Sequence, residues 1–352
     1  IAAAAMLLAE QWPDAIVVLV TGRGLIGDRV PVGEALDRAG ILLRKPQQRS
    51  GSRGATDILI DDLTAKLLET SFRMRPDSEG HHVLTGEELS ADVSRPLLGK
   101  PTPCVGRDQE LAILESMFRG CVEDSAPRVA LVVAPPGMGK SRLRHEFLRR
   151  LETHRQDYLV LLGRSDPMSA GSSCGLLGQA LRRFCGVQDG ESAAARSAKL
   201  TQRISHNLPE PIQHRVTEFI GELCKVPVTA EPSPKLRAAR QNPRIMSDQL
   251  GLALLDFLRA ECQVRPVLLV LEDLHWGDKL SVRLVDLALR GLTDQPLMVL
   301  ALARPEVEEL YPRIWAGLTQ QITLQPLSKR AGAARAAGAG AAVLSSHHLA
   351  HR

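Results

Sequence analysis

The sequence predicts an α/β protein built on a parallel β-sheet with helices on both faces. Three observations lead to this prediction. Short apolar runs that suit buried strands alternate along the chain with longer segments whose apolar residues recur at helical spacing. A glycine-containing loop at 134–141 joins one of these strands directly to a helix. Another strand ends in two adjacent acids, Glu272 and Asp273.

The composition is that of a globular protein with an aliphatic core. Of the 352 residues, 44% are hydrophobic but only 3% are aromatic, and the net charge of +4 is too small to argue for nucleic acid. The six cysteines are scattered without a C-x-x-C pair, which indicates buried thiols in a reducing cytosol. No apolar run approaches a membrane span, and the start lacks the features of a signal peptide. We therefore expect a cytoplasmic protein, and because it begins with Ile1 we expect it to be part of a longer one.

Residues 1–93 are expected to form a small α/β unit. Their apolar patterns predict the following elements: strands at 14–20, 57–60 and 82–84, helices at 32–43 and 61–68, and a loop at 45–54. Asp61 or Asp62 would cap the second helix.

This order of elements resembles the last third of a class III nucleotide cyclase domain. The resemblance rests on the strand and Thr-Gly turn at 16–22, on Gly27-Asp28, on the helix at 33–43, and on the strand and helix at 58–68. In that family an Asn and, four residues later, an Arg stabilise the transferring phosphoryl group. Arg38 stands at the Arg position, but Glu34 replaces the Asn, and the family's metal-binding Asp residues belong to a part that is absent here. We expect a packing or sensing unit without cyclase activity.

Two segments of unusual composition divide the chain. Residues 94–103 contain three Pro and one Gly, which predicts a linker between domains. A second domain is then expected over 104–327. Residues 328–352 are rich in Ala, Gly, Arg and His, with little apolar periodicity, so we expect a disordered tail or the product of a reading-frame change.

The loop Ala134-Pro135-Pro136-Gly137-Met138-Gly139-Lys140-Ser141 has the context of a phosphate-binding loop, because a strand at 128–133 precedes it and a helix at 142–150 follows. Its glycines let the backbone approach an anion, which the helix N-terminus also favours. Lys140 would reach the β- and γ-phosphates, and the Ser141 hydroxyl would bind Mg²⁺. The alternative is an ordinary Gly/Pro turn. The predicted nucleotide contacts are Pro136, Gly137, Met138, Gly139, Lys140, Ser141 and Arg142.

Glu272 and Asp273 end the apolar strand 266–271, and the carboxyl edge of a parallel sheet is where ligands bind. One acid would orient Mg²⁺ together with Ser141, and the other would polarise the attacking water. By position Glu272 is the metal-side acid and Asp273 the water-side acid, although the two roles can be exchanged. Arg304 follows a further core strand at 296–303 and belongs to the same predicted edge.

The rest of the second domain alternates helices, strands and loops. The predicted elements are helices at 108–120, 176–184, 215–224, 247–261 and 279–290, a strand at 157–162, a loop at 163–175 and a long loop or insertion at 225–243. Asp278 is expected to cap the helix at 279–290.

Two motifs place the second domain near a known family. V-G-R-x-x-E-L at 105–111 resembles the N-terminal signature of AAA-type and STAND-type ATPases, and E-D-L-H-W-G-D at 272–278 resembles the corresponding acidic motif of STAND ATPases fused to bacterial cyclases, Ser/Thr kinases and LuxR-type regulators. This resemblance implies that Arg304 is a sensor of the γ-phosphate and that His275 and Trp276 are structural. It also implies that the backbone of three residues packs against adenine: Val105, Gly106 and Arg107. Residues 320–327 resemble the strand that leads into the helical lid of this family.

The function expected from these features is that of an ATP-binding and ATP-hydrolysing switch module in a bacterial signal-transduction regulator. Its cofactors would be ATP and Mg²⁺, and its catalytic residues would be Lys140, Glu272, Asp273 and Arg304. Two alternatives remain open: a regulator that binds ATP or ADP without turnover, and, less favoured, a nucleotide cyclase. The expected partners are ATP or ADP, other domains of a parent protein (kinase, cyclase or helical repeats) and further copies in a nucleotide-dependent oligomer, with no nucleic acid and no membrane.

Overall fold

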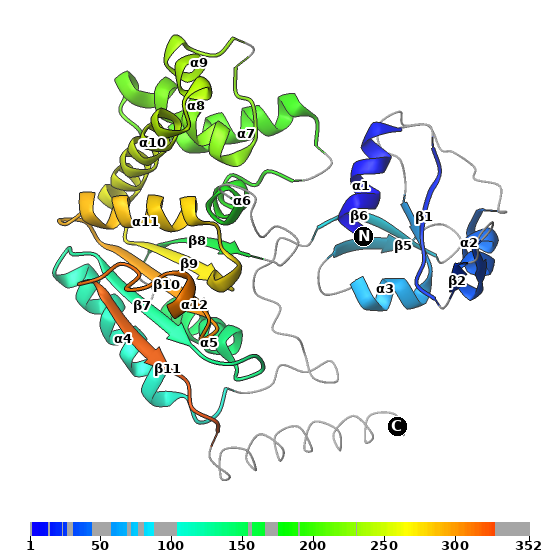
Figure 1. The fold of residues 1–352 in the computed structure, drawn as a ribbon, viewed down its shortest axis with the longest axis horizontal. Coiled ribbons are helices and arrows are strands. Elements are labelled where there is room, and N and C mark those ends of the chain that lie inside the picture. The colour runs from blue at the N-terminus through cyan, green and yellow to red at the C-terminus, as the bar shows by residue number, and fades with distance from the viewer. Residues whose placement is uncertain are drawn as a thin grey trace. The chain divides into compact units, whose positions relative to one another are not determined.

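The computed structural model describes residues 2–12, 15–22, 24–26, 31–43, 58–68, 72–76, 81–87, 104–153, 157–165, 175–188, 191–229 and 231–327 (Figure 1). The expected loop at 45–54, Gly27-Asp28, the linker at 94–103 and the tail at 328–352 lie outside the described residues. The chain divides into two compact units, which we describe separately. The first contains Ile1–Val93, and the second contains Ser94–Val187 and Ala193–Arg352.

A five-stranded parallel sheet forms the centre of the second unit, as the sequence predicts. Its strands are β7 (Arg128–Val133), β8 (Leu159–Arg164), β9 (Val267–Glu272), β10 (Leu297–Ala303) and β11 (Thr319–Thr323). They lie in the order β11-β7-β10-β9-β8, and every neighbouring pair is parallel. Because β10 separates β7 from β9, the segments that leave these three strands come together at the carboxyl edge of the sheet.

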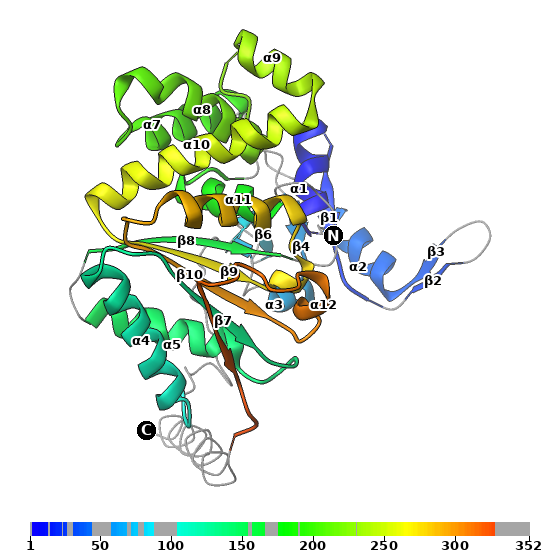
Figure 2. The same cartoon turned by 60° about the vertical axis from the view of Figure 1, so that its left-hand side comes forward.

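Helices cover both faces of this sheet. The helices of this unit are α4 (Asp108–Glu123), α5 (Lys140–Thr153), α6 (Gly175–Phe184), α7 (Ala193–Ser205), α8 (Glu210–Cys224), α9 (Pro234–Gln241), α10 (Pro243–Val264), the 3₁₀ turn η1 (Leu274–Trp276), α11 (Lys279–Gly291) and α12 (Val307–Leu310). In Figures 1 and 2, α4 and α5 lie on one side of the sheet and α6, α10 and α11 on the other. The predicted architecture of a parallel sheet between two helical layers is confirmed.

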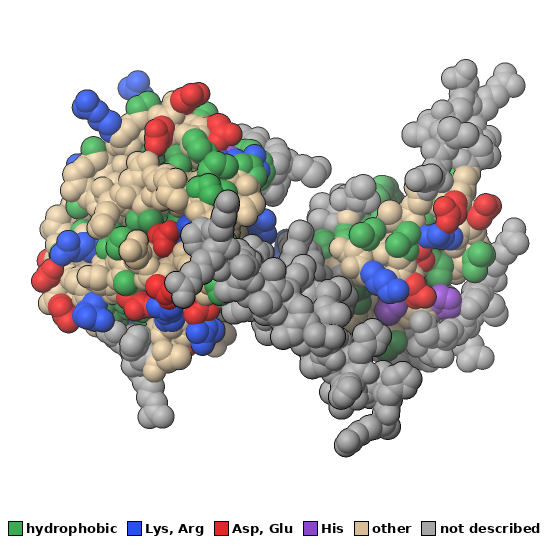
Figure 3. Space-filling view, turned by 90° about the horizontal axis from the view of Figure 1, so that it is seen from below, with side chains coloured by type: hydrophobic (Ala, Val, Ile, Leu, Met, Phe, Trp, Pro, Cys, Tyr) green, Lys and Arg blue, Asp and Glu red, His purple; other side chains and the backbone are tan. Residues whose placement is uncertain are grey.

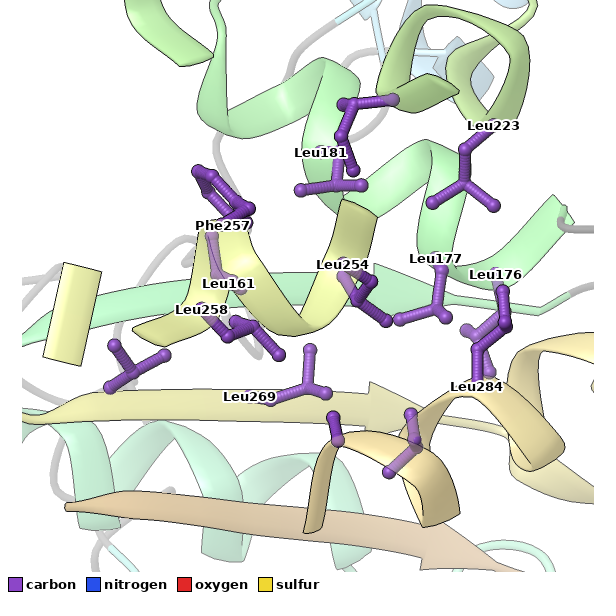
Figure 4. Close-up of a cluster of buried hydrophobic side chains, with 14 of the residues drawn as sticks. Leu161, Leu176, Leu177, Leu181, Leu223, Leu254, Phe257, Leu258, Leu269 and Leu284 are labelled. Carbon is purple, nitrogen blue, oxygen red and sulfur yellow. The ribbon is translucent and has the colours of Figure 1, made fainter. Parts of the chain in front are cut away.

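The core of this unit is aliphatic, as the composition predicts. All residues of the central strands β9 and β10 are buried, because both faces of these strands are covered. Figure 4 shows leucines of α6 and α10 gathered with Phe257 over Leu161 of β8 and Leu269 of β9. This packing holds the strands in register, so that their carboxyl ends present a rigid edge.

The segment 225–243, expected to be a long loop, contains the helix α9 and the start of α10, so that expectation was wrong. Pro234 stands in the first turn of α9, where the missing N–H of proline costs nothing. The Ser233 hydroxyl caps this helix by accepting from the Leu236 N–H at 3.1 Å. Asn242 caps α10 by accepting from the Arg244 N–H at 3.0 Å. Two of the prolines in this segment therefore lie in the first turns of helices, although prolines also indicate loops in a sequence.

The first unit has a mixed four-stranded sheet in the order β1-β4-β6-β5. β1 and β4 are parallel, and β6 is antiparallel to both β4 and β5. Its elements are α1 (Ala2–Gln11), β1 (Val17–Leu19), β2 (Gly24–Ile26), β3 (Pro31–Gly33), α2 (Glu34–Leu43), β4 (Ile58–Ile60), α3 (Asp62–Leu68), β5 (Phe72–Pro76) and β6 (His82–Glu87). The sequence did not predict α1, β5 or the β2–β3 pair. α1 is a helix because Ala2, Ala5, Met6 and Ala9 share one buried side, a pattern hidden by the uniform alanine composition.

The described surface agrees with the modest net charge. On the face shown in Figure 3, acidic and basic side chains are interspersed over the second unit. Among the helices that the structure describes, none combines the length and hydropathy that crossing a bilayer requires.

Candidate functional site

Two glycines in the loop between β7 and α5 adopt left-handed backbone conformations. Gly137 has φ of +77° and Gly139 has φ of +92°, and side chains are strained at such angles. The Ala134 N–H donates to the carbonyl of Ala303 at 3.2 Å, which joins the start of the loop to the end of β10. Pro135, Pro136 and both glycines are exposed, so the backbone of the loop is accessible.

Lys140 lies at the first turn of α5 and folds back over this loop. Its Nζ donates to the carbonyls of Ala134 at 2.6 Å and Pro135 at 3.1 Å. The pKa of Lys140 is lowered, and burial is the largest cause. The negative charge of Asp273 opposes this shift, whereas the positive charge of Arg304 adds to it. Lys140, Asp273 and Arg304 follow the adjacent strands β7, β9 and β10, so three of the predicted residues lie at the same edge of the sheet.

The two adjacent acids have different surroundings. Glu272 is buried, and its Oε1 lies 3.1 Å from Nε of Arg144 on α5. The side chain of Asp273 is 23% exposed, and its Oδ2 lies 3.3 Å from Nε of Arg164 at the end of β8. Asp273 also has φ of +53°, which is uncommon outside glycine and is a type of strain that concentrates at functional sites.

Arg304 lies at the end of β10 and contacts both residues of the His-Trp pair. The Arg304 N–H donates to Nδ1 of His275 at 3.4 Å, and the guanidinium carbon lies 4.6 Å from the centroid of the Trp276 ring. Burial lowers the pKa of His275, which therefore favours the neutral ring. This is consistent with Nδ1 as an acceptor.

The side chain of Arg107 is buried and lies beneath the phosphate loop. Its Nη2 donates to the carbonyls of Met138 at 3.1 Å and Gln325 at 2.8 Å, and its Nη1 donates to Glu110 at 2.8 Å. The sequence proposed only a backbone contact for Arg107, and it gave no signal for this bridge. Val105 is half-buried and Gly106 is exposed with φ of +68°.

The other predicted contacts lie along the start of α5. Ser141 is exposed beside Lys140, and Arg142 is half-buried. Sequence reasoning missed Arg144 and Arg164, the partners of the two acids. Arg144 lies in a helix with many other charges, so only the tertiary structure distinguishes it.

The side chains at this site can supply only part of the coordination of a Mg²⁺ ion. Within the described part of the chain, no three His, Cys, Asp or Glu side chains gather closely enough to hold a metal ion by themselves. Mg²⁺ bound with a nucleotide needs only one or two protein ligands in addition to phosphate oxygens. Ser141 is exposed and Asp273 is partly accessible, which fits that requirement, whereas Glu272 is buried against Arg144.

In the first unit, the Arg38 side chain is fully engaged. Its guanidinium pairs with Glu34, lies 3.3 Å from Oδ2 of Asp61 and donates to the Thr21 carbonyl at 3.4 Å. Asp61, rather than Asp62, accepts from the Thr64 N–H at 3.2 Å and so caps α3. Arg38 is thus neutralised by carboxylates of its own unit.

Comparison with known proteins gives one family match. Residues 103–300 match the family model described as the AAA ATPase domain. Over 229 residues the chain is 27% identical to an uncharacterized protein of Rhizobium meliloti (strain 1021), which covers 64% of this chain and 20% of that protein. The chain thus spans about a fifth of the length of this relative.

Solved structures resemble the chain more distantly. The ORC1 protein of Aeropyrum pernix in complex with DNA has a TM-score of 0.37 at 15% identity, covering 67% of this chain and 50% of its own. Drosophila ORC bound to DNA has a TM-score of 0.37 at 15% identity, covering 85% of this chain and 56% of its own.

Proposed function

The chain belongs to the AAA ATPase domain family, and on that premise we propose that it binds ATP at the loop 134–141 and hydrolyses it. The observation that carries this proposal is the strand order β7-β10-β9, which places Lys140, Arg304 and Asp273 after three adjacent parallel strands at one edge of the sheet. A lysine, an acid and an arginine from three adjacent strands can together hold a triphosphate and direct water at it.

In this proposal the loop backbone and the N-terminus of α5 hold the β-phosphate. Positive φ at Gly137 and Gly139 leaves the N–H groups of the loop free of crowding side chains. Lys140 exchanges its two loop carbonyls for phosphate oxygens, which are better partners for an ammonium group. Arg304 contacts the γ-phosphate.

We assign the main catalytic duty among the acids to Asp273. Its charge acts on Lys140 and on His275, and its carboxylate is partly accessible. Glu272 instead holds α5 against β9 through Arg144. The sequence favoured Glu272 as the metal-side acid and left the exchange of the two roles open, and this proposal takes the exchanged order.

Mg²⁺, when bound with ATP, would neutralise phosphate charge that develops during transfer. The residues that would hold it are Ser141 and Asp273.

Nucleotide binding is tested by Lys140→Ala in the full 352-residue chain, with Lys235→Ala on the exposed side of α9 as the matched control. We expect the Lys140 variant to lose most of its affinity for both ATP and ADP in isothermal titration, while the Lys235 variant binds as wild type. Equal affinity in the Lys140 variant would refute the proposed site.

Hydrolysis is tested by steady-state phosphate release. We expect Asp273→Asn to lose at least about a hundredfold in kcat, as for removal of a group that stabilises or activates the transition state, while it still binds ATP. A wild-type protein that binds ATP without phosphate release above background would favour the second candidate, a regulator that does not turn over nucleotide.

We further propose that this ATPase is the switch module of a larger signalling regulator. The support is the likeness of 272–278 to the STAND motif and the small fraction of its relative that the chain spans. In this scheme residues 1–93 are a partner domain, 94–103 a linker, 104–327 the ATPase and 328–352 a tail. Nucleotide-dependent association with other copies or other domains would be the output.

A further inference from the structure

The guanidinium of Arg304 rests on the face of Trp276. Its carbon lies 4.6 Å from the ring centroid, within the range in which a cation is attracted to an indole. Among the residues that the structure describes, no carboxylate lies within ion-pair distance of this guanidinium. Its hydrogen-bond donors therefore remain available for an anion, while the aromatic face restricts its position.

The turn that carries Trp276 is rigid. The Trp276 N–H donates to the Asp273 carbonyl at 2.9 Å, and the Gly277 N–H donates to the Leu274 carbonyl at 2.8 Å. The Tyr311 hydroxyl donates to the Gly277 carbonyl at 2.6 Å. A side chain at Gly277 would place its Cβ 2.8 Å from the Leu274 carbonyl, so the turn requires glycine.

Asp278 anchors the other end of this turn. Its carboxylate accepts from the Ser281 N–H at 2.8 Å and from the Ser281 hydroxyl at 2.7 Å, and thereby caps α11. The backbone that carries Trp276 is consequently fixed between a capped helix and the end of β9. A side chain that projects from such a fixed turn can position a partner without itself contacting a ligand.

Arg304 is also held through its backbone. Its N–H donates to Nδ1 of His275 at 3.4 Å, and the His275 and Trp276 rings are 4.5 Å apart. The side chain and the main chain of Arg304 thus both contact one short turn. This turn begins directly after Asp273, whose charge also acts on Lys140.

We propose that Trp276 is a positioning residue that holds the Arg304 guanidinium at the phosphate end of the site and thereby sets the preference for ATP over ADP. The inference rests on the proposed function, because it requires a nucleotide at the loop 134–141. ADP lacks the phosphate that Arg304 would contact, so the loss of the indole weakens ATP binding selectively. Without Trp276, the long arginine side chain must be ordered on binding, at a cost in entropy.

The test is the ratio of ATP to ADP affinity, measured by isothermal titration on the full chain with Trp276→Leu and Trp276→Phe. We expect Trp276→Leu to weaken ATP binding about two- to tenfold, the range of a cation–π contact, with ADP affinity unchanged. Trp276→Phe keeps a weaker aromatic face and is expected to fall between Trp276→Leu and wild type. In Arg304→Gln the preference is lost, and adding Trp276→Leu to it changes nothing further.

Trp315→Phe is the matched control for loss of an indole. Trp315 is buried and donates to the Val282 carbonyl at 3.1 Å, so its loss affects packing but not Arg304. We expect this variant to keep the wild-type ratio. An unchanged ratio in Trp276→Leu, or tighter ATP binding, would overturn the proposal, whereas retained binding in Lys140→Ala would overturn the proposed function instead.

Should Trp276→Leu not fold, tryptophan emission of the Phe variant gives a second measurement. ATP, but not ADP, is expected to change the emission of the wild-type protein, because a phosphate would alter the charge next to Trp276. This change should be absent in Trp276→Phe and in Arg304→Gln. An equal change in Trp276→Phe would contradict the positioning role.

Discussion

Glu272 and Asp273 show how strongly a residue's role depends on its surroundings. They are neighbours in the sequence, yet one is buried against Arg144 and the other is partly accessible beside Arg164. A buried ion pair contributes little net stability, because desolvation offsets the attraction between the charges. Removal of one partner is costly, since it leaves the other charge buried and uncompensated.

We therefore expect Glu272→Gln to lower the free energy of unfolding by about 3–5 kcal/mol. The double variant Arg144→Met/Glu272→Gln should recover part of that loss, because no buried charge is then left without its partner. Urea unfolding followed by tryptophan emission measures both, without nucleotide.

The exposed i,i+4 pair of Asp286 and Arg290 on α11 supplies the control. Asp286→Asn should leave the unfolding midpoint unchanged within error, because solvent screens such pairs. If Glu272→Gln were as stable as Asp286→Asn, the buried pair would have no structural role.

At the scale of elements, close approach of helices builds the layer above the sheet. α6 packs against α8 at Gly178, where an added Cβ would lie 2.4 Å from the Leu223 carbonyl. Gly120 in α4 is a helical glycine without this constraint, since its nearest neighbour would be the Arg128 Nη2 at 3.7 Å. Replacement of glycine by alanine is therefore expected to have opposite effects on stability at the two positions.

We expect Gly178→Ala to destabilise the second unit by about 1–3 kcal/mol, the usual cost of forcing extra atoms into a packed interior. Gly120→Ala should be neutral or stabilising by up to about 1 kcal/mol, because alanine reduces the freedom of the unfolded chain. Thermal unfolding of the two variants decides this. Equal destabilisation of both would show that the α6–α8 distance is not limiting.

At the scale of the molecule, Arg107 joins parts of the second unit that are far apart in sequence. Its guanidinium holds the Met138 carbonyl of the phosphate loop and the Gln325 carbonyl just beyond β11. Among the strands that the structure describes, β11 lies at the edge of its sheet and pairs with β7 alone. A change in the loop can therefore reach the chain that leaves the sheet.

We expect Arg107→Lys to speed hydrogen exchange in β11 and to weaken ATP binding about tenfold, because a lysine ammonium cannot reproduce the planar fork of arginine. Mass spectrometry of peptides covering 319–325 measures the exchange. Arg119→Lys, on the exposed side of α4, is the control and should behave as wild type. Unchanged hydrogen exchange in Arg107→Lys would show that Arg107 does not couple the phosphate loop to β11.

Local sequence alone determined the parallel α/β architecture, the phosphate-loop context at 134–141 and the cap at Asp278. Each of these follows from periodicity and glycine or capping chemistry within a few residues. The helix α9 escaped prediction because its prolines match the signals of a loop, and α1 escaped because its uniform alanine composition hides the periodicity of its buried side.

Only the tertiary structure decided which charges meet. Arg144 with Glu272, Arg107 with Met138 and Gln325, and Trp276 with Arg304 are pairs formed by strand order and helix packing. No local pattern encodes these pairs, because a partner many residues away comes within reach only when the strands have assembled into the sheet.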